Sequence, residues 1–391
     1  MSKVVDCEVI VVGAPWRELT LIEVTTDGGV TGLGEVRMVN KTDTLVACIT
    51  ELADRYLIGR DPFDTARLAW DVQVGEYGVP GEVAQSALAA LDTACWDIMG
   101  KELGVPIWKL LGGRFRDRIP AYANGWYRGV RDPVSIAELA ETVVERGYRA
   151  MKIDPFGAAA NEMSRGERRL AVDIISHVRE AVGPDVELFL EMHGRFTAAT
   201  ALELIADLRH LDMGWYEEPV PPDDHIGYRT VRQATDVRIA AGERLHRISE
   251  LHPFLAGGLL DVIQVDLTHH AGLTGMQRLA GWTTAANVML APHNVCGPVG
   301  TAAALHLGVT YPNFKILEHF NDFADPWVMD LVTKAPTVDA EDGCFPVPTE
   351  PGLGFELRRE ICDAHPRSGG RLRLFTEGWE KRAEAPSEVD R

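Results

Sequence analysis

The sequence predicts an α/β fold in which a closed barrel of parallel strands follows a separate α+β unit. Between residues 118 and 320, apolar strand candidates alternate with amphipathic helix candidates. Polar residues end six successive strands, at Glu191, Glu217, Glu243, Asp266, His293 and Glu318, which are 23 to 27 residues apart. One strand, one crossover helix and two loops take about that length. The N-terminal 117 residues show a different pattern, so we expect them to form a domain of their own.

The first domain, residues 1–117, is predicted to begin with strands and to continue with helices. Residues 3–12 and 18–27 are rich in β-forming residues, and Asp27-Gly28-Gly29 is a turn signal. From about residue 41 to 111 apolar residues recur at helical spacing. After about residue 325 the barrel pattern ends, and residues 371–375 are a candidate for one further strand.

Eight strands are predicted for the barrel domain, residues 118–325. They lie at 118–124, 149–154, 186–191, 214–217, 238–243, 261–266, 288–293 and 314–318. Helix candidates between them include 135–147, 167–182, 199–211 and 273–286. In such a barrel the C-terminal ends of the strands form the active-site face. We therefore expect the residues that end the strands to meet in one site.

Three of those residues are glutamates on adjacent strands: Glu191, Glu217 and Glu243. A single glutamate at a strand end is usually a solvated loop residue. Three of them in register would repel one another unless a cation joins them. Because all three offer hard oxygen ligands, the sequence predicts a Mg²⁺ site.

The bulk composition excludes several classes of partner. The 391 residues carry a formal net charge of −19 without a basic block, so nucleic acid and anionic membranes are poor partners. There is no apolar stretch of the roughly 20 residues that a membrane span needs. The six cysteines form no CxxC pair, and the N-terminus does not resemble a signal peptide. We expect a cytoplasmic location.

Several longer motifs resemble a known family. They are the stretches 87–101 and 106–113, Glu217-Glu218-Pro219, Gly242-Glu243-Arg244, 291–294 and 351–354. Together they resemble the mandelate racemase and muconate lactonizing enzyme branch of the enolase superfamily. The resemblance implies a modified TIM-like (β/α)7β barrel under an α+β cap, with the C-terminal segment 326–391 returning to the cap. It also implies Mg²⁺ on the three glutamates and a homo-oligomer.

Two histidines are candidates for proton transfer. His193 lies two residues beyond Glu191, so on an extended segment both side chains would face one pocket. His293 ends the strand after the one that Asp266 ends, and a carboxylate there can hold one ring nitrogen and raise the basicity of the other. The alternatives are a structural hydrogen bond for His193 and a buried polar pair without a catalytic task for Asp266 and His293.

Within the branch, the sequence is most similar to acid-sugar dehydratases of the galactonate dehydratase type. His193-Gly194-Arg195 and the pair of Asp266 and His293 carry this similarity. Two positions depart from the pattern. Glu191 stands where many relatives have Asp, and Lys152-Ile153-Asp154 stands where the racemases have Lys-x-Lys. Asp154 argues against a two-base transfer through lysines. We expect Lys152 to be a cation near the substrate carboxylate, the alternative being a lysine stacked at the edge of the core.

The resemblance implies dehydration of a sugar acid, an aldonate or an aldarate, to a 2-keto-3-deoxy acid. His293 would remove the α proton and His193 would protonate the departing β-hydroxyl. Glu318 would hydrogen-bond the enediolate oxygen, provided that burial keeps it protonated. The candidates for substrate contacts are Asn124, Trp126, Arg195 and Arg37.

Three alternatives stay open. An epimerase or cycloisomerase of a sugar acid or its lactone would use the same two histidines. A metal-dependent hydrolase on a barrel would need His-x-His on the first strand, where this chain has Ala121-Tyr122-Ala123-Asn124. A non-catalytic barrel would have no reason to keep both the acids and the histidines.

Overall fold

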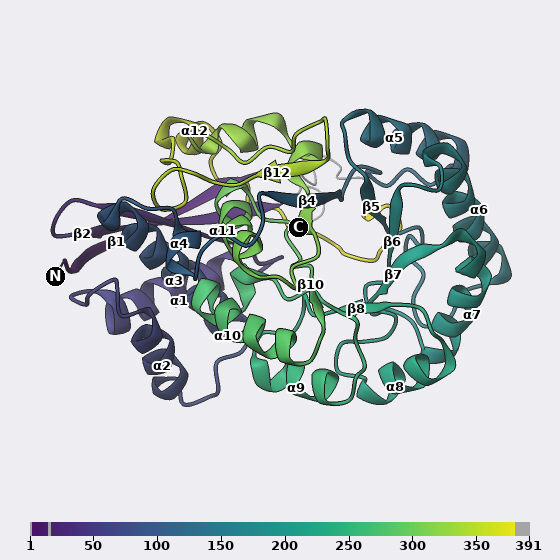
Figure 1. Cartoon of the computed structure of the whole chain (residues 1–391), viewed down its shortest axis with the longest axis horizontal. Coiled ribbons are helices and arrows are strands. Elements are labelled where there is room, and N and C mark those ends of the chain that lie inside the picture. Colours follow the sequence, from purple (N-terminus) through teal and green to yellow (C-terminus); the bar gives the residue numbers. More distant parts are fainter. Residues whose placement is uncertain (1, 15–16, 380–391) are drawn as a thin grey trace.

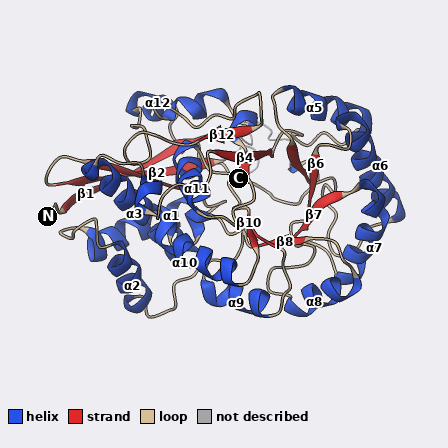
Figure 2. Cartoon of the chain, viewed as in Figure 1, coloured by secondary structure: helices blue, strands red, loops and turns tan. Residues whose placement is uncertain are grey.

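The computed structural model describes residues 2–14 and 17–379, in which a ring of parallel strands lies beside a smaller antiparallel sheet (Figure 1). Helices surround the ring on its outside (Figure 2). The strands of the ring are β4 (Arg118–Ala123), β5 (Ala150–Ile153), β6 (Glu187–Glu191), β7 (Met213–Glu217), β8 (Ile239–Ala241), β9 (Val262–Ile263), β10 (Met289–Leu290) and β11 (Leu317–His319).

Each of the first seven barrel strands is followed by a helix. These helices are α5 (Pro133–Glu145), α6 (Arg165–Val182), α7 (Ala198–Leu208), α8 (His225–Ala234), α9 (Ile248–Ala256), α10 (Gly272–Ala285) and α11 (Pro298–Thr310). The strands pair in the order β10-β9-β8-β7-β6-β5-β4-β11, and a parallel bridge between Leu290 and Phe314 closes the ring. The predicted (β/α)7β barrel is confirmed.

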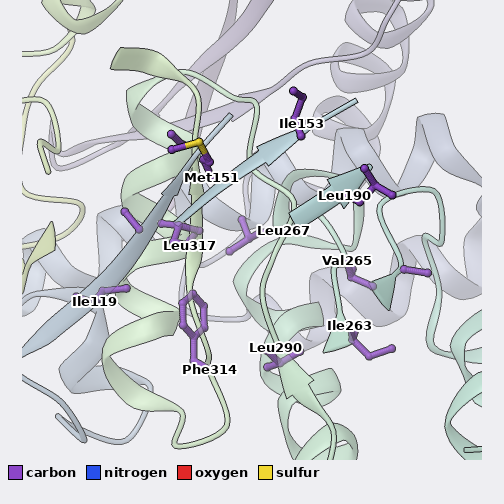
Figure 3. Close-up of a cluster of buried hydrophobic side chains, with 14 of the residues drawn as sticks. Ile119, Met151, Ile153, Leu190, Ile263, Val265, Leu267, Leu290, Phe314 and Leu317 are labelled. Atoms are coloured by element: carbon purple, nitrogen blue, oxygen red, sulfur yellow. The ribbon is translucent and has the colours of Figure 1, made fainter. Parts of the chain in front are cut away.

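Alternation along the strands separates two apolar layers. Ile119, Met151, Ile153, Leu190 and Leu317 point away from the barrel axis and pack under the helices (Figure 3). A second cluster fills the inside of the barrel: Tyr122, Ala150, Phe189, Trp215, Ala240, Val262, Ala291 and Ile316. Since side chains two positions apart on a strand share a face, the residues two positions beyond Ala150, Phe189, Trp215 and Ile316 also point inward. Those residues are Lys152, Glu191, Glu217 and Glu318.

The cap combines a three-stranded antiparallel sheet with four helices. The strands are β1 (Val4–Gly13), β2 (Glu18–Thr26) and β3 (Thr31–Val36). The helices are α1 (Thr42–Leu52), which continues as the π-helical turn Ala53–Leu57, α2 (Thr65–Gly75), α3 (Glu82–Leu103) and α4 (Ile107–Leu110). Strand β3 touches α3 closely, because a Cβ at Gly32 or Gly34 would lie 2.1 or 2.2 Å from the carbonyl oxygens of Ala94 and Ala90. The cap has its own core around α3.

Buried carboxylates of the cap hold backbone N–H groups of the barrel. Glu35 accepts hydrogen bonds from the N–H groups of Gly297 and Gly300 at the start of α11. Asp92 accepts one from Thr274 at the start of α10 (2.9 Å). The N-terminus of a helix presents unpaired N–H groups and partial positive charge, so it is a natural partner for a carboxylate. These contacts fix the cap over the barrel.

The C-terminal segment returns to the cap, as predicted, after one contact with the barrel. Strand β12 (Cys344–Pro346) pairs antiparallel with β4. The N–H of Leu353 then donates to the buried Asp97 of α3 (2.7 Å), and helix α12 (Arg359–Ala364) places Arg359 against Glu8 and Glu23. The short 3-10 helices of the fold are Arg209–Leu211, Leu267–His269, Asn321–Phe323 and Pro326–Leu331.

The strand predicted at 371–375 is wrong. Residues 371–373 have no regular structure, and Leu374 and Phe375 form a turn. The alternating apolar pattern there serves a different purpose, described below. Among the described helices, none combines the length and the apolar composition that a membrane span requires.

The contact between cap and barrel gives a prediction for stability. Burial raises the pKa of Asp92 from 3.8 to about 7, although the hydrogen bonds from Thr274 oppose this. The folded state therefore holds the proton more tightly than the unfolded state. This contribution stabilises the fold below the unfolded pKa and is lost as the pH rises through about 7. Asp92→Asn removes the titration and keeps an acceptor.

From pH 5 to pH 8 we expect the melting temperature of the wild type to fall by at least about 2 °C more than that of Asp92→Asn. Differential scanning calorimetry measures this difference. Parallel curves for the two proteins would contradict the assignment.

Candidate active site

A cavity of about 430 Å³ lies at the C-terminal ends of the barrel strands, between the barrel and the cap. Its barrel residues are Asn124, Gly125, Tyr127, Arg128, Lys152, Glu191, His193, Glu243, Arg244, His246, His269, His293, Val295 and Phe320. The cap contributes Arg37, Met38, Val39, Asn40, Lys41 and Glu82, and the C-terminal segment contributes Leu374, Phe375 and Trp379.

The three predicted metal ligands meet beside this cavity. One carboxylate oxygen each from Glu191, Glu217 and Glu243 lies within 4.8 Å of the others, so the group could hold a metal ion. Glu191 and Glu217 end β6 and β7, and Glu243 follows Gly242, whose φ of 138° suits glycine. The Glu217 carboxylate also accepts hydrogen bonds from Gln264 (2.6 Å) and Trp215 (3.1 Å).

Lys152 projects its ammonium group into the same cluster. Its Nζ lies 2.7 Å from Glu217 Oε1, 3.1 Å from Glu318 Oε1 and 3.2 Å from Glu191 Oε2. The Lys152 side chain is 2% exposed, and its Nζ lies 5.7 Å from the ring centre of Tyr122. Lys152 is therefore not a lysine stacked at the edge of the core. Lys152 is a buried cation on the cavity wall, paired with carboxylates.

One ammonium group does not neutralise the four carboxylates of Glu191, Glu217, Glu243 and Glu318, and burial acts unequally on them. Burial raises the pKa of Glu191 to about 7, with Lys152 opposing and Glu243 adding repulsion. Burial and then the charge of Glu191 raise the pKa of Glu217 well above its usual value. Glu191 Oε2 is buried and accepts no well-aligned hydrogen bond, although the Lys152 ammonium lies 3.2 Å away. Three crowded oxygen ligands with excess negative charge fit a hard divalent cation.

His293 is held by Asp266, as predicted. The His293 Nδ1 lies 2.8 Å from Asp266 Oδ2, and its Nε2 lies 3.4 Å from Glu243 Oε2. The other Asp266 oxygen accepts from the backbone N–H and the hydroxyl of Thr268, each at 2.7 Å. Burial opposes charge on the imidazole, but Glu243 and the hydrogen bond with Asp266 outweigh it and raise the pKa of His293 to about 10.

His193 has a carboxylate partner that the sequence did not indicate. Its Nδ1 lies 2.7 Å from Asp154 Oδ2. Arg195 Nη2 also donates to both carboxylate oxygens of Asp154, at 2.6 Å to Oδ2 and 2.9 Å to Oδ1. His193 does not continue an extended strand, because its φ is 47° and its N–H turns back to Glu191 Oε1 (2.7 Å). The prediction that His193 and Glu191 share a pocket still holds geometrically, for a different reason.

The four predicted substrate contacts divide into two groups. Asn124 and Arg37 line the cavity. Trp126 does not: it packs in the core, and its Nε1 donates to the carbonyl of Lys152 (2.9 Å). Arg195 is 5% exposed, does not line the cavity, and supports His193 through Asp154. For Trp126 and Arg195 the expected direct contact is therefore replaced by a supporting position.

Glu318 is buried as expected, but burial does not keep it protonated. Lys152 and His293 attract its charge and Asn294 donates an N–H (2.8 Å), so the pKa of Glu318 is lowered although burial alone would raise it. Asn124 Nδ2 also donates to Glu318 (2.6 Å). The predicted hydrogen-bond donor is thus an ionised acceptor that orients Lys152 and Asn124.

Several residues that line the cavity were not predicted as site residues from the sequence. Arg244 belongs to the motif Gly242-Glu243-Arg244. It forms an ion pair with the buried Glu218 of the motif Glu217-Glu218-Pro219, so the two motifs are in contact. His269 is held by Ser86 of the cap (2.7 Å) and has no signal except its place after Asp266. Phe375 and Trp379 come from far along the chain, where no local pattern links them to the barrel.

Comparison with known proteins agrees with this geometry. The profile described as "Enolase C-terminal domain-like" matches residues 135–361, and "Mandelate racemase / muconate lactonizing enzyme, N-terminal domain" matches residues 11–112. The chain belongs to the mandelate racemase and muconate lactonizing enzyme family. The resemblance predicted from the motifs is confirmed, including the cap and the barrel of this family.

Relatives in the family include D-gluconate dehydratase of Thermoproteus tenax, which is 36% identical over 354 residues (90% of this chain and 71% of that protein). The D-gluconate/D-galactonate dehydratase of Picrophilus torridus is 30% identical over 352 residues (90% of this chain and 89% of that protein). The crystal structure of a mandelate racemase/muconate lactonizing enzyme from Jannaschia sp. CCS1 superposes with a TM-score of 0.88 at 32% identity, covering 95% of this chain and all of that one.

The position of Lys152 gives a second prediction. Lys152→Met leaves buried carboxylates without their cation, so without divalent metal it should lower the free energy of unfolding by roughly 3–5 kcal/mol at pH 8. The loss should be smaller at pH 5, where the carboxyl groups with raised pKa take up protons. Urea unfolding measures both values.

Lys41→Met is the matched control. Lys41 pairs with Glu82 in a half-exposed position, where an ion pair contributes about 0–1 kcal/mol. Equal losses for the two variants would contradict the importance of the buried cation.

Proposed function

We propose that this protein is a Mg²⁺-dependent dehydratase that converts a sugar acid to a 2-keto-3-deoxy acid. One observation carries the proposal: two histidines, each held by its own carboxylate, stand on opposite sides of the barrel. His193 follows β6 and His293 follows β10, and four steps separate these strands in the ring of eight. The three glutamates lie beside the cavity between them. The names of the dehydratases from Thermoproteus tenax and Picrophilus torridus support the same reaction.

Glu191, Glu217 and Glu243 are the residues that would hold the metal. When bound, Mg²⁺ stabilises the negative charge that develops on a substrate carboxylate as its α proton leaves. Lys152 supplies a permanent positive charge at the same wall. Glu318 also contacts that ammonium group, and Asn124 in turn donates a hydrogen bond to Glu318.

His293 is the proposed general base. His293 lines the cavity, and its Nδ1–H donates to Asp266, which leaves Nε2, on the side of Glu243, to accept the α proton. Burial would raise the pKa of Asp266, but His269, His293 and Thr268 lower it strongly, so this carboxylate stays ionised and fixes the imidazole. The imidazolium that forms is stabilised by the same carboxylate.

His193 is the proposed general acid that protonates the departing β-hydroxyl. Asp154 holds its Nδ1, so Nε2 is the nitrogen that can transfer a proton. Arg195 fixes Asp154 from behind. The enol formed by loss of water collapses to the 2-keto-3-deoxy acid.

Two opposed histidines also fit an epimerase, in which one removes and the other returns the α proton on the opposite face. A cycloisomerase would use the same pair. The product distinguishes these reactions, because only dehydration yields a keto acid. A homo-oligomer and a cytoplasmic location stay predictions.

The roles of the histidines can be separated by isotope exchange. A panel of mono- and diacid sugars is first tested for keto-acid formation with semicarbazide, with and without excess EDTA. For an active sugar acid, His293→Asn should lose dehydration and solvent-deuterium exchange at the α carbon. His193→Asn should lose dehydration but keep exchange, because the base is intact. Each loss should be at least about 10²-fold.

Exchange lost in His193→Asn but kept in His293→Asn would reverse the two roles. Full activity in EDTA would contradict the metal. Near-normal dehydration in both variants would contradict the whole site.

A further inference from the structure

We propose that Phe375 and Trp379, from the C-terminal segment, form a specificity wall that selects the configuration of the sugar acid at C4. The inference rests on the proposed function for its substrate class. It goes beyond that function in assigning stereochemical discrimination to residues outside both the barrel and the N-terminal part of the cap.

The segment 368–379 is tied down on both sides of the cavity. On the cap side, Asn40 makes two hydrogen bonds with the backbone of Leu372, each 2.8 Å, and Glu18 accepts the N–H of Gly369 (2.9 Å). On the barrel side, Trp379 Nε1 donates to the carbonyl of Gly157 (3.1 Å). In Figure 1 the yellow end of the chain runs across the barrel. The segment therefore spans the site at defined points.

Its two aromatic rings stand against the proposed general acid. The ring centre of His193 lies 5.3 Å from that of Phe375 and 5.6 Å from that of Trp379, and the two aromatic rings are 5.1 Å apart. Arg195, which holds Asp154, has its Cζ 4.7 Å from the ring centre of Phe375. The rings thus cover the network of His193, Asp154 and Arg195 and line the cavity beside it.

The backbone conformation at Phe375 indicates that surrounding contacts hold this residue in place. Its φ of 59° lies in the left-handed region, which a bulky side chain seldom adopts. Such a conformation persists only where the surrounding contacts impose it, and such sites cluster where ligands are held. Here the contacts are the Arg195 guanidinium and the rings of His193 and Trp379.

Substrate geometry then decides which carbon the wall meets. The β-hydroxyl is on C3 of an aldonate, so C3 must lie next to His193 for protonation. C2 is held on the side of the metal ligands and His293, so C4, the other neighbour of C3, is the carbon that we place against the rings that flank His193. An aromatic face accepts a C–H group and rejects a hydroxyl that it cannot hydrogen-bond. Two sugar acids that differ only at C4 would therefore bind with different strength.

D-Gluconate and D-galactonate are such a pair, and they are the probes for the test. kcat and KM are measured for both with the wild type, Phe375→Ala and Trp379→Ala. We expect the ratio of the two kcat/KM values to change by about tenfold or more in at least one alanine variant, mainly through KM. Solvent-deuterium exchange at the α carbon should persist, because His293 is untouched. Trp379→Phe, which keeps an aromatic face, should retain most of the wild-type ratio.

Glu377→Ala is the matched control, since Glu377 is exposed in the same segment and does not line the cavity. Melting temperatures close to that of the wild type confirm that the variants are folded. If the wild type uses neither probe, the active acid from the panel and its C4 epimer replace them.

A ratio that stays within about twofold in both alanine variants overturns the wall, while dehydration by the wild type leaves the proposed function intact. A wild type that dehydrates no sugar acid contradicts the proposed function, and the wall with it.

Discussion

Four carboxylates and one ammonium group are buried together at the top of an aromatic barrel core, and the rest of the site depends on that charge imbalance. Below them, Phe189 and Trp215 stack with ring centres 3.5 Å apart, and Tyr122 meets both edge-on. This floor excludes water from beneath the carboxylates, which strengthens their mutual repulsion. Lys152 offsets part of it. The three glutamates of this cluster are therefore able to hold a divalent cation.

The charge of Glu243 links the metal site to the proton-transfer site. Glu243 is the largest of the attractions that raise the pKa of His293 to about 10. A raised pKa favours the protonated imidazole, which opposes the role of a base. For the proposed base, a cation on Glu243 would weaken this attraction and lower the pKa of His293, whereas Asp266 would still hold the ring. The glutamate cluster and His293 are thus electrostatically coupled.

The regular part of the site was predictable from the sequence because the barrel repeats. Strand ends at intervals of about 25 residues indicated the register of Glu191, Glu217, Glu243, Asp266 and His293. Contacts between side chains from loops that follow different strands were not predictable from the sequence. Asp154 was recognised as a departure from Lys-x-Lys, but its contact with His193 depends on the left-handed turn after β6.

Two further predictions, for Glu318 and for residues 371–375, differ from the structure for reasons that depend on the folded chain. Burial of Glu318 alone suggested a protonated acid, but the three-dimensional proximity of Lys152 and His293 reverses the direction of the pKa shift. Residues 371–375 resembled a strand because the apolar Leu372 and Leu374 alternate with Arg371 and Arg373. In the structure Leu374 and Phe375 form a turn instead. They are apolar because they face the cavity.

The proposed metal site is tested most directly by calorimetric titration of Mg²⁺ into the metal-free protein at about pH 6.5, in two buffers of different ionisation enthalpy. Metal ligands must be deprotonated, and the pKa values of Glu191 and Glu217 are raised, so binding should release protons. The account predicts binding heats that differ between the buffers, and a smaller difference for Glu191→Gln. Absence of binding, or equal heats in both buffers, would contradict it.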